Sequence, residues 1–364
     1  MNILVINWQD WKNPMAGGAE LYLYEVFSRL VNKGHKVTVL CSRAEGQSRH
    51  EVLDGFEIYR MGKRSNFNFF VPTAVRSILR HKRIDVVVDD LNKIPFYSPL
   101  FTRKQVLPML MHIFRSTIYR ETNFVFASYV FLTERIIPYL YPSSKFVAIS
   151  NSTADDLKAI GVKSRIYVIP PGIPKIPQIS AGARQKNLVV YVGRVKKYKS
   201  IDHFVRAMAI VKNRNGVEAI VVGDGDAKED LIDLSKKLNV QIRFTGFVSE
   251  EEKYRIYSKA RVVVQPSIKE GWGLTAIEAQ SCGTPVVCAD SPGLREVVLN
   301  GETGFLHKYG SIDTLAERII QLLDDEEKWR KFSVAAKNWA NSFSWDKAAA
   351  SLEQILKSQS NYEL

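Results

Sequence analysis

The stretch EGWGLTAIEA, residues 270–279, carries the strongest structural signal in the sequence. Two carboxylates, Glu270 and Glu278, flank a turn with two glycines, and this turn leads into an apolar helical pattern. The backbone N–H groups expected in the first turn of that helix are those of Gly273, Leu274 and Thr275. Unpaired donors and the helix dipole stabilise an anion at such a position. The pattern therefore predicts an anion site beside two carboxylates. In the alternative interpretation it is an ordinary strand–turn–helix connection, and Glu278 only caps or solvates the helix.

Short runs rich in Val and Ile alternate along the chain with segments of helical spacing. The first series of apolar runs covers residues 3–6, 36–40, 56–60, 84–88, 106–111 and 146–149. The second series covers residues 188–192, 218–222, 241–245, 262–265, 285–289 and 304–306. Alternation of this kind indicates a parallel sheet with helices on both faces. The sequence predicts an α/β fold with two doubly wound sheets, one for each series.

A cluster of prolines separates the two series. Four prolines crowd into residues 170–177, and proline at this density fixes φ and prevents regular strand pairing. This stretch is the predicted linker. We expect one domain over residues 1–172 and a second over residues 173–344, which suits a chain of 364 residues.

Glycines and polar side chains recur just after the predicted strands. In parallel sheets, ligands bind beyond the carboxyl ends of the strands, so these residues are candidates for a common site. The candidates are Gly17, Gly18, Asp89, Asn92, His112, Arg115, Arg194, Lys199, Gly223, Gly225, Phe247 and Val248. Some have plain structural alternatives. Gly17 and Gly18 also suit a simple turn, His112 suits a satisfied structural histidine, and Lys196 or Lys197 can replace Lys199 in the argument.

The order and spacing of these motifs resemble those of retaining family 4 glycosyltransferases of the GT-B fold. The segments that carry the resemblance are PMAGGAE (14–20), LVVYVGR (188–194), VVGDGD (221–226), FTGFVS (244–249), EGWGLTAIEA (270–279), QSCGTPVVCAD (280–290) and SPGLREVVLNGETGFL (291–306). Together they extend over nearly the whole chain. The resemblance implies two facing Rossmann-like domains with a cleft between them. It also implies that a C-terminal helix at about residues 345–364 packs back onto the N-terminal domain.

The resemblance also implies a role for each motif around a nucleoside-diphosphate sugar. Arg194 and Lys199 would hold the diphosphate, because a guanidinium and an ammonium oppose the charge that develops on the leaving group. Glu270 would contact the transferred sugar, and Glu278 the ribose. His112 would bind the donor sugar or the reacting centre.

The remaining motifs would surround the other parts of the substrates. The loop with Gly17 and Gly18 would close over the phosphates and the reacting sugar. Gly223 and Gly225 would allow close backbone approach, and the nucleobase would lie near Phe247 and Val248. Asp89, Asn92 and Arg115 would lie on the acceptor side or in turns. No metal ion and no cofactor other than the donor substrate is implied.

Composition and cysteine usage indicate a cytoplasmic globular protein. The three cysteines, Cys41, Cys282 and Cys288, are dispersed, which disfavours a disulfide framework and favours a reducing compartment. Residues 1–7 lack the features of a signal peptide. The longest apolar stretch, residues 124–141, is interrupted by Glu134 and Arg135 and is not expected to span a membrane.

Positive charge is concentrated in the first half of the chain. Residues 1–175 carry +10 of the total formal charge of +13. This predicts a polyanionic partner such as a phospholipid surface or a lipid-linked diphosphate, with solubility as the alternative reason. Nucleic acid is disfavoured because no recognition motif accompanies the charge. The segment 63–83 mixes Phe67, Phe69 and Phe70 with basic residues, which suits a membrane interface. Packing of those rings into the N-terminal domain is equally compatible with the sequence.

The resulting functional hypothesis is a retaining, metal-independent hexosyltransferase. It would move a hexose or N-acetylhexosamine from a nucleoside-diphosphate sugar, UDP first and GDP second, to a hydroxyl acceptor. A lipid-linked glycan or other glycoconjugate precursor at the inner face of the cell membrane is the expected acceptor. The alternatives are a soluble sugar or polyol acceptor, and a nucleotide-sugar epimerase or hydrolase of the same fold.

Overall fold

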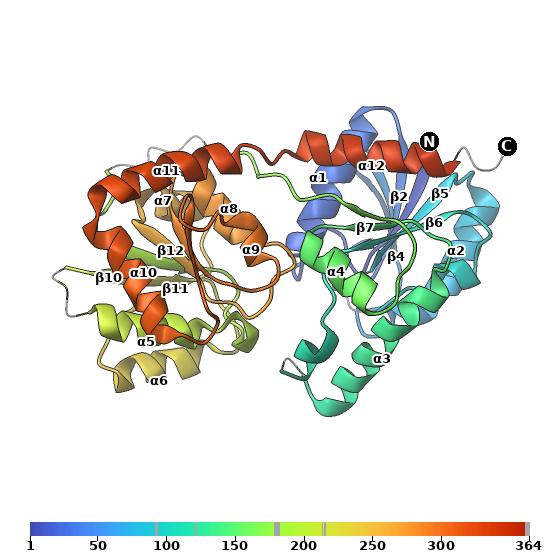
Figure 1. Ribbon diagram of the computed structural model, residues 1–364. Coiled ribbons are helices and arrows are strands. Elements are labelled where there is room, and N and C mark those ends of the chain that lie inside the picture. The colour runs from blue at the N-terminus through green and yellow to red at the C-terminus, as the bar shows by residue number, and fades with distance from the viewer. Residues whose placement is uncertain (92–93, 121, 178–182, 213, 215, 361–364) are drawn as a thin grey trace. The chain divides into compact units, whose positions relative to one another are not determined.

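A computed structural model describes residues 1–91, 94–120, 122–177, 183–212, 214 and 216–360 (Figure 1). The chain divides into two compact units. Unit 1 comprises Met1–Gly172 and Ser344–Leu364, and unit 2 comprises Ile173–Phe343. Each unit contains one sheet built mainly of parallel strands with helices around it, so the predicted α/β class is confirmed.

The sheet of unit 1 has eight described strands in the order β3-β4-β2-β1-β5-β6-β7-β8. Their bounds are β1 Asn2–Ile6, β2 Lys36–Cys41, β3 His50–Leu53, β4 Phe56–Arg60, β5 Val86–Leu91, β6 Val106–Leu110, β7 Phe146–Ala148 and β8 Ile166–Val168. Only β3 among them pairs antiparallel, with β4. The two edge strands β3 and β8 were not predicted. Both lie partly exposed, and neither has the continuous apolar run of a buried strand.

The helices of unit 1 cover this sheet. They are α1 Gly18–Asn32, α2 Phe67–His81, α3 Phe124–Leu140, α4 Asn151–Ala159 and α12 Trp345–Ser360, with 3-10 turns η1 Ser98–Leu100 and η2 Arg115–Arg120. Helices α2, α3 and α4 share one hydrophobic cluster with the sheet. Helix α2 begins at Phe67, within the segment 63–83. It continues through Pro72 because Phe67 and Val71 are buried in that cluster. The expectation of Phe67 as an interfacial residue is therefore wrong.

Helix α12 returns from the end of unit 2 and packs beside α1. Glu353 of α12 accepts a bond from Lys33 at 2.6 Å and contacts the His35 ring at 3.2 Å. Trp345, at the start of the helix, meets the ring of Tyr22 with a centroid separation of 5.6 Å. Its backbone nitrogen lies 2.1 Å from where a Cβ on Gly172 would be, so this contact requires glycine.

Unit 2 contains a sheet of six described strands, all parallel, in the order β11-β10-β9-β12-β13-β14. The strands are β9 Leu188–Val192, β10 Glu218–Val222, β11 Arg243–Gly246, β12 Val262–Gln265, β13 Val286–Ala289 and β14 Gly304–His307. The helical elements are η3 Lys197–Lys199, α5 Ile201–Val211, α6 Lys228–Lys237, α7 Glu250–Lys259, α8 Leu274–Ser281, α9 Leu294–Val297, α10 Ile312–Asp324 and α11 Glu326–Ala340. Each strand of the second predicted series is present.

Strand order reverses once in each sheet. In unit 1 the chain moves from β1 toward β2 on one side and later from β5 toward β6 on the other. In unit 2 it moves from β9 toward β10, and later from β12 toward β13. Loops diverge at such a reversal and leave a crevice beyond the carboxyl ends of the two central strands. The crevices expected to hold ligands therefore follow β1 and β5 in unit 1, and β9 and β12 in unit 2.

Candidate functional site

Two residues that are 71 positions apart in sequence lie together beyond the carboxyl ends of β9 and β12. Lys199 ends the short turn η3 after β9, and Glu270 follows β12. The Lys199 Nζ lies 2.6 Å from Oε1 and 2.7 Å from Oε2 of Glu270. Both side chains are mostly buried, with 13% and 15% of their surfaces exposed. Burial lowers the pKa of Lys199, but the negative charge of Glu270 outweighs this effect and the net pKa is raised. The ammonium is therefore charged at neutral pH.

The neighbouring cations are placed differently. Arg194 directly follows the β9 turn and its side chain is exposed. Lys196 pairs with Asp226 at 2.7 Å rather than with Glu270. Lys197 is exposed, on the first position of η3. Of the three lysines considered in this segment, Lys199 is the one whose ammonium lies beside Glu270.

Helix α8 begins where the sequence placed it, at Leu274. Its N-cap is Gly273, with φ of 105°, a left-handed conformation that strongly favours glycine. A Cβ there would also lie 3.0 Å from side-chain carbons of Leu294 and Val297. The glycine thus sets the start of the helix, and the N–H groups of Leu274 and Thr275 lie in its first turn.

Glu278 projects from the second turn of α8 and is 4% exposed. Lys253 of α7 contacts its two carboxylate oxygens at 3.3 and 3.2 Å, and the Tyr257 hydroxyl donates to Oε2 at 3.1 Å. Burial raises the pKa of Glu278, while Lys253 acts in the opposite direction. Sequence reasoning missed both partners, because they come from another helix and no motif spacing links them to the carboxylate.

The two glycines after β10 are required by neighbouring backbone. A Cβ on Gly223 would lie 2.0 Å from the carbonyl oxygen of Gly193, and one on Gly225 would lie 2.1 Å from that of Val195. The sequence predicted that a ligand would approach the backbone closely at these glycines. The close partner in the structure is the loop that follows β9, so the glycines hold the segment of Arg194 close to β10.

An exposed aromatic ring follows the adjacent strand. Phe247 comes directly after β11 and is 80% exposed, and Val248 beside it is half-buried. The exposed ring offers a face on which a planar ligand can stack.

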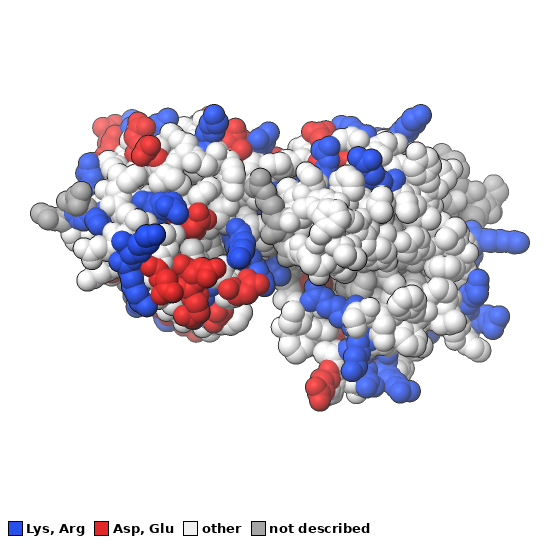
Figure 2. Space-filling view, turned by 90° about the horizontal axis from the view of Figure 1, so that it is seen from below, with Lys and Arg blue, Asp and Glu red and all other residues white. Residues whose placement is uncertain are grey.

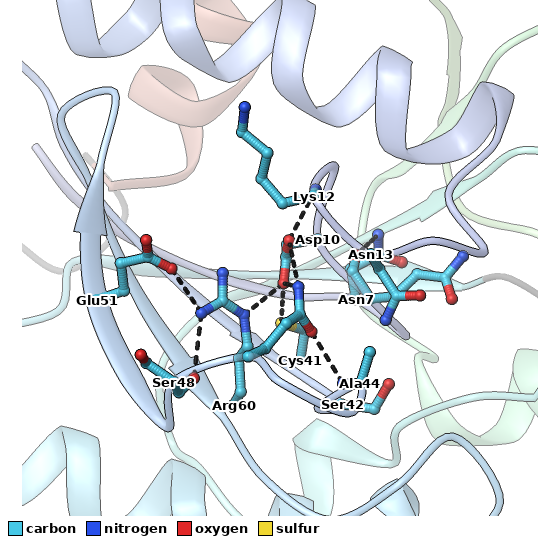
Figure 3. A network of polar contacts seen from close by, with 12 residues as sticks. Asn7, Asp10, Lys12, Asn13, Cys41, Ser42, Ala44, Ser48, Glu51 and Arg60 are labelled. Carbon is cyan, nitrogen blue, oxygen red and sulfur yellow. Dashed lines mark hydrogen bonds and ion pairs between the residues drawn. The ribbon is translucent and has the colours of Figure 1, made fainter.

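The loop after β1, residues 7–17, is anchored by a buried ion pair (Figure 3). Asp10 lies in the interior and accepts a 2.6 Å bond from Nε of Arg60, at the end of β4. Neither side chain is more than 1% exposed. The other Asp10 oxygen accepts from the Lys12 N–H at 2.8 Å, and Arg60 also reaches Glu51 at 2.7 Å. A pair between strand and loop was not visible in the sequence.

Further bonds fix the tip of this loop, which carries the predicted glycines. The Gln9 side chain donates to the Met15 carbonyl at 2.7 Å, and the Asn13 side chain accepts from the Met15 N–H at 3.0 Å. The Gly17 N–H donates to Glu20 at 2.7 Å, which closes the first turn of α1. The tip therefore presents exposed backbone at Gly17 and Gly18 on an ordered base.

The other predicted residues of unit 1 have separate neighbours. His112 follows β6 and is half-buried, with its ring 4.1 Å from that of Phe114. Arg115, at the start of η2, contacts Asp156 at 3.2 Å. Asn92 lies outside the described residues.

Asp89 has an interior role and is a correction to the prediction. It is fully buried, and its two oxygens accept from the hydroxyls of Ser98 at 2.5 Å and Tyr141 at 2.7 Å. Burial raises its pKa to about 6 in spite of these bonds. A carboxylate enclosed in this way joins β5 to the segments packed on it and does not face an acceptor.

Two family models cover most of the chain. The model described as Glycosyltransferase Family 4 matches residues 16–175, and that described as Glycosyl transferases group 1 matches residues 173–339. A protein of Methanocaldococcus jannaschii described as an uncharacterized glycosyltransferase is 24% identical over 98% of both chains.

Solved structures share the fold. Sucrose-phosphate synthase from Thermosynechococcus elongatus superposes with a TM-score of 0.80 at 20% identity, over 98% of both chains. The Anabaena protein HepE in complex with UDP-glucose gives a TM-score of 0.77 at 19% identity, over 98% of this chain and 100% of that one. The chain belongs to the family 4 glycosyltransferases and has the GT-B fold.

None of the helices among the described residues is long and apolar enough to cross a bilayer. In the same residues, no group of three or more His, Cys, Asp or Glu side chains is arranged to hold a metal ion.

Proposed function

We propose that this glycosyltransferase transfers a hexose or N-acetylhexosamine from a UDP-sugar with retention of configuration. The acceptor is a hydroxyl of a lipid-linked glycan or other glycoconjugate precursor. The observation that carries the proposal is the contact of Lys199 with Glu270 beside Arg194, at the strand-order reversal of unit 2. A structural neighbour holds UDP-glucose, which supports UDP as the donor nucleotide.

In this proposal, the cations stabilise the leaving diphosphate. Two of the three N–H donors of Lys199 are directed at Glu270, which leaves one for a phosphate oxygen. Arg194 is exposed and adds a planar set of donors that suits phosphate. Fixed positive charge beside a departing oxyanion is among the largest contributions to catalysis, because it needs no reorganisation during the reaction.

Glu270 binds the transferred sugar rather than forming a bond to it. A carboxylate nucleophile must present an unhindered oxygen to the anomeric carbon. Both Glu270 oxygens are held by one ammonium at under 3 Å, which reduces their nucleophilicity and leaves lone pairs for sugar hydroxyls. We therefore favour attack of the acceptor on the face from which the diphosphate leaves, with a phosphate oxygen taking the acceptor proton.

The role of Glu278 in this scheme is to accept hydrogen bonds from the ribose. Lys253 contacts both of its carboxylate oxygens and Tyr257 donates to Oε2, so the two residues fix its orientation and offset its burial. Phe247, exposed after β11, contributes a ring surface for the base. His112 is assigned to the donor sugar, and the tip with Gly17 and Gly18 to its phosphates.

The proposal is tested by donor screening on the purified protein. UDP is expected to raise the melting temperature more than GDP or ADP at equal concentration, because ligands that bind the native state stabilise it. Consumption of UDP-sugars is then followed with and without a polyprenyl-linked glycan, and the anomeric configuration of the product is determined. Turnover is expected to persist with EDTA. Release of UDP at one rate with or without any acceptor would instead identify a hydrolase, and an inverted product would exclude retention.

The two carboxylates are expected to give different kinetic defects. Glu270→Gln should lower kcat and leave the affinity for free UDP within about twofold, since its partner is the sugar. Glu278→Gln should weaken UDP binding by about 1.5–3 kcal/mol, the range for a hydrogen bond to a charged group. Calorimetry with UDP separates the two variants. Equal losses of UDP affinity would contradict this division of roles.

A further inference from the structure

An apolar stripe runs along the outer side of α3. Val125, Tyr129, Leu132, Ile136 and Tyr139 are spaced by four, three, four and three residues, which places them on one side of the helix. Their exposed fractions are 78, 47, 59, 42 and 82%. Phe124, at the start of the helix, is 74% exposed. The opposite side of α3, with Val130 and Ile137, is buried. We call the five residues the α3 stripe.

A cavity lined by basic side chains lies in the same helical layer. It has a volume of about 460 Å³ and is formed by the second half of α2 and the segment before β6. Six of its ten lining residues are basic and none is acidic: Arg76, Arg80, Lys82, Arg83, Arg103 and Lys104. Helices α2 and α3 share one core cluster, so the cavity and the α3 stripe belong to the layer of helices on one side of the sheet. We call these six residues the basic cavity.

The charged residues that line the cavity are all basic, and two of them pair with acidic neighbours outside the lining. Lys82 pairs with Glu57 and Arg83 contacts Asp85, while Arg80 and Arg103 have no ion pair with any described residue. On α3 itself the charged residues are Glu134 and Arg135. The Glu134 carboxylate is buried and accepts from the N–H groups of Phe114 and Arg115, so Arg135 is the exposed charge. In Figure 2, which views the molecule from the side where α3 lies lowest in Figure 1, Lys and Arg lie along much of the edge of a wide white area, with some Asp and Glu among them.

We propose that the α3 stripe and the basic cavity form a docking surface for an anionic lipid membrane. The stripe enters the boundary between headgroups and acyl chains, with α3 lying in the plane of the interface. The basic cavity holds the phosphates of the headgroups. Helices with an apolar side and basic neighbours bind anionic bilayers in this way. Tyr129 and Tyr139 suit the boundary, because each has an apolar ring and a polar tip.

Charge complementarity favours a lipid surface over a second copy of the chain. If two α3 stripes packed against each other, the interface would contain Arg135 of both copies and no exposed acidic residue of α3. Anionic headgroups neutralise Arg135 and the basic cavity together. The inference rests on the proposed function only in that the acceptor would be presented in the membrane; vesicle binding itself needs neither donor nor acceptor.

Vesicle flotation tests the docking surface in the full-length protein. Vesicles contain either phosphatidylcholine alone or equal parts of phosphatidylcholine and phosphatidylglycerol. The wild-type protein is expected to float with the anionic vesicles at low salt, and much less with neutral vesicles or at high salt. Leu132→Ser with Ile136→Ser should lower the bound fraction about tenfold, because two aliphatic side chains no longer enter the bilayer. Val52→Ser, at a valine on edge strand β3 that is 70% exposed, is the matched control and should float like the wild type.

Charge variants test the basic cavity separately. Arg80→Gln with Arg103→Gln should abolish the preference for anionic vesicles. Lys236→Gln with Lys331→Gln removes the same charge from two exposed lysines of unit 2 and should leave the preference unchanged. Tripolyphosphate is the soluble probe. If it binds in an Arg80- and Arg103-dependent way while anionic vesicles do not, the cavity takes a free polyanion and the membrane proposal is overturned.

Other results also overturn the proposal. Wild-type protein that stays out of the anionic vesicle fraction at low salt excludes this surface as a membrane site. A dimer in sedimentation that Leu132→Ser with Ile136→Ser converts to monomer would show that a second copy occupies the α3 stripe. UDP-induced thermal shifts are measured on every variant. Lost flotation with an unchanged thermal shift shows that the docking surface and the proposed donor site are separate. A protein that floats but does not bind UDP would contradict the proposed function and leave the docking surface standing.

Discussion

Lys199→Met is expected to lower the turnover number by about 10²–10³-fold, the effect of removing one preorganised charge-stabilising donor from an active site. Methionine keeps much of the length and apolar character of the lysine stem, so packing around η3 changes little. The loss has two physical sources. The leaving diphosphate loses a cation, and Glu270 loses the ammonium that holds both of its oxygens. Donor consumption under saturating acceptor, with circular dichroism to verify folding, measures the effect.

Neighbouring substitutions provide the controls for this experiment. Lys197→Met, two residues earlier on the same 3-10 turn, should retain turnover within about twofold, because Lys197 is exposed and is not assigned to the donor. Arg194→Ala should weaken UDP binding by about 1.5–3 kcal/mol. Glu270→Gln combined with Lys199→Met removes the carboxylate that the single variant leaves without a partner. If the folded single variant keeps wild-type turnover, the diphosphate is stabilised elsewhere.

Arg60→Met is expected to destabilise unit 1 by about 3–5 kcal/mol, the cost of breaking a buried ion pair by removing one partner. Asp10 would remain in the interior without its 2.6 Å partner, beside the thiol of Cys41. The loop over residues 7–17 would lose the strand to which it is anchored, so turnover should fall as well. Denaturation in urea followed by far-ultraviolet circular dichroism gives the free energy of unfolding.

A double-substitution cycle isolates this pair. Asp10→Asn with Arg60→Met removes the uncompensated charge and should recover part of the stability lost by Arg60→Met alone. Arg255→Met serves as the surface control: this residue pairs with Glu251 and Glu252 on α7 and should change stability by less than about 1 kcal/mol. Equal costs for Arg60→Met and Arg255→Met would contradict the assigned role of the buried pair.

The sequence predicted most central strands because they are buried on both faces. Continuous Val and Ile runs such as LVVYV at β9 have no other favourable environment in a soluble fold. Edge strands lack this property. In β3 the alternating exposure of HEVL leaves charged residues in the strand, so only its pairing with β4 reveals it. Helix α2 holds Pro72 in its interior, where burial of Phe67 and Val71 outweighs the hydrogen bond that proline cannot donate.

The site was predicted where local sequence determines local backbone. Gly273 sets the start of α8, and the spacing from Glu270 to Glu278 follows from helix geometry. The sequence could not predict ion-pair partners that only tertiary packing places together, such as Lys253 with Glu278 and Arg60 with Asp10. Asp89 was misassigned for the same reason. A carboxylate at the end of a strand resembles a ligand-binding group until Ser98 and Tyr141 are found to enclose it.

The return of α12 to unit 1 has a consequence for the order of folding during synthesis. The ribosome makes residues 1–172 first, yet that unit lacks its last helix until all of unit 2 has been translated. Leu352, Ile355 and Leu356 cover buried surface that is open to chaperones during this interval. Unit 2, by contrast, is one continuous segment and can fold as soon as it has left the ribosome. The nascent chain should therefore reach protease resistance in its second half before its first, against the usual direction from the N-terminus.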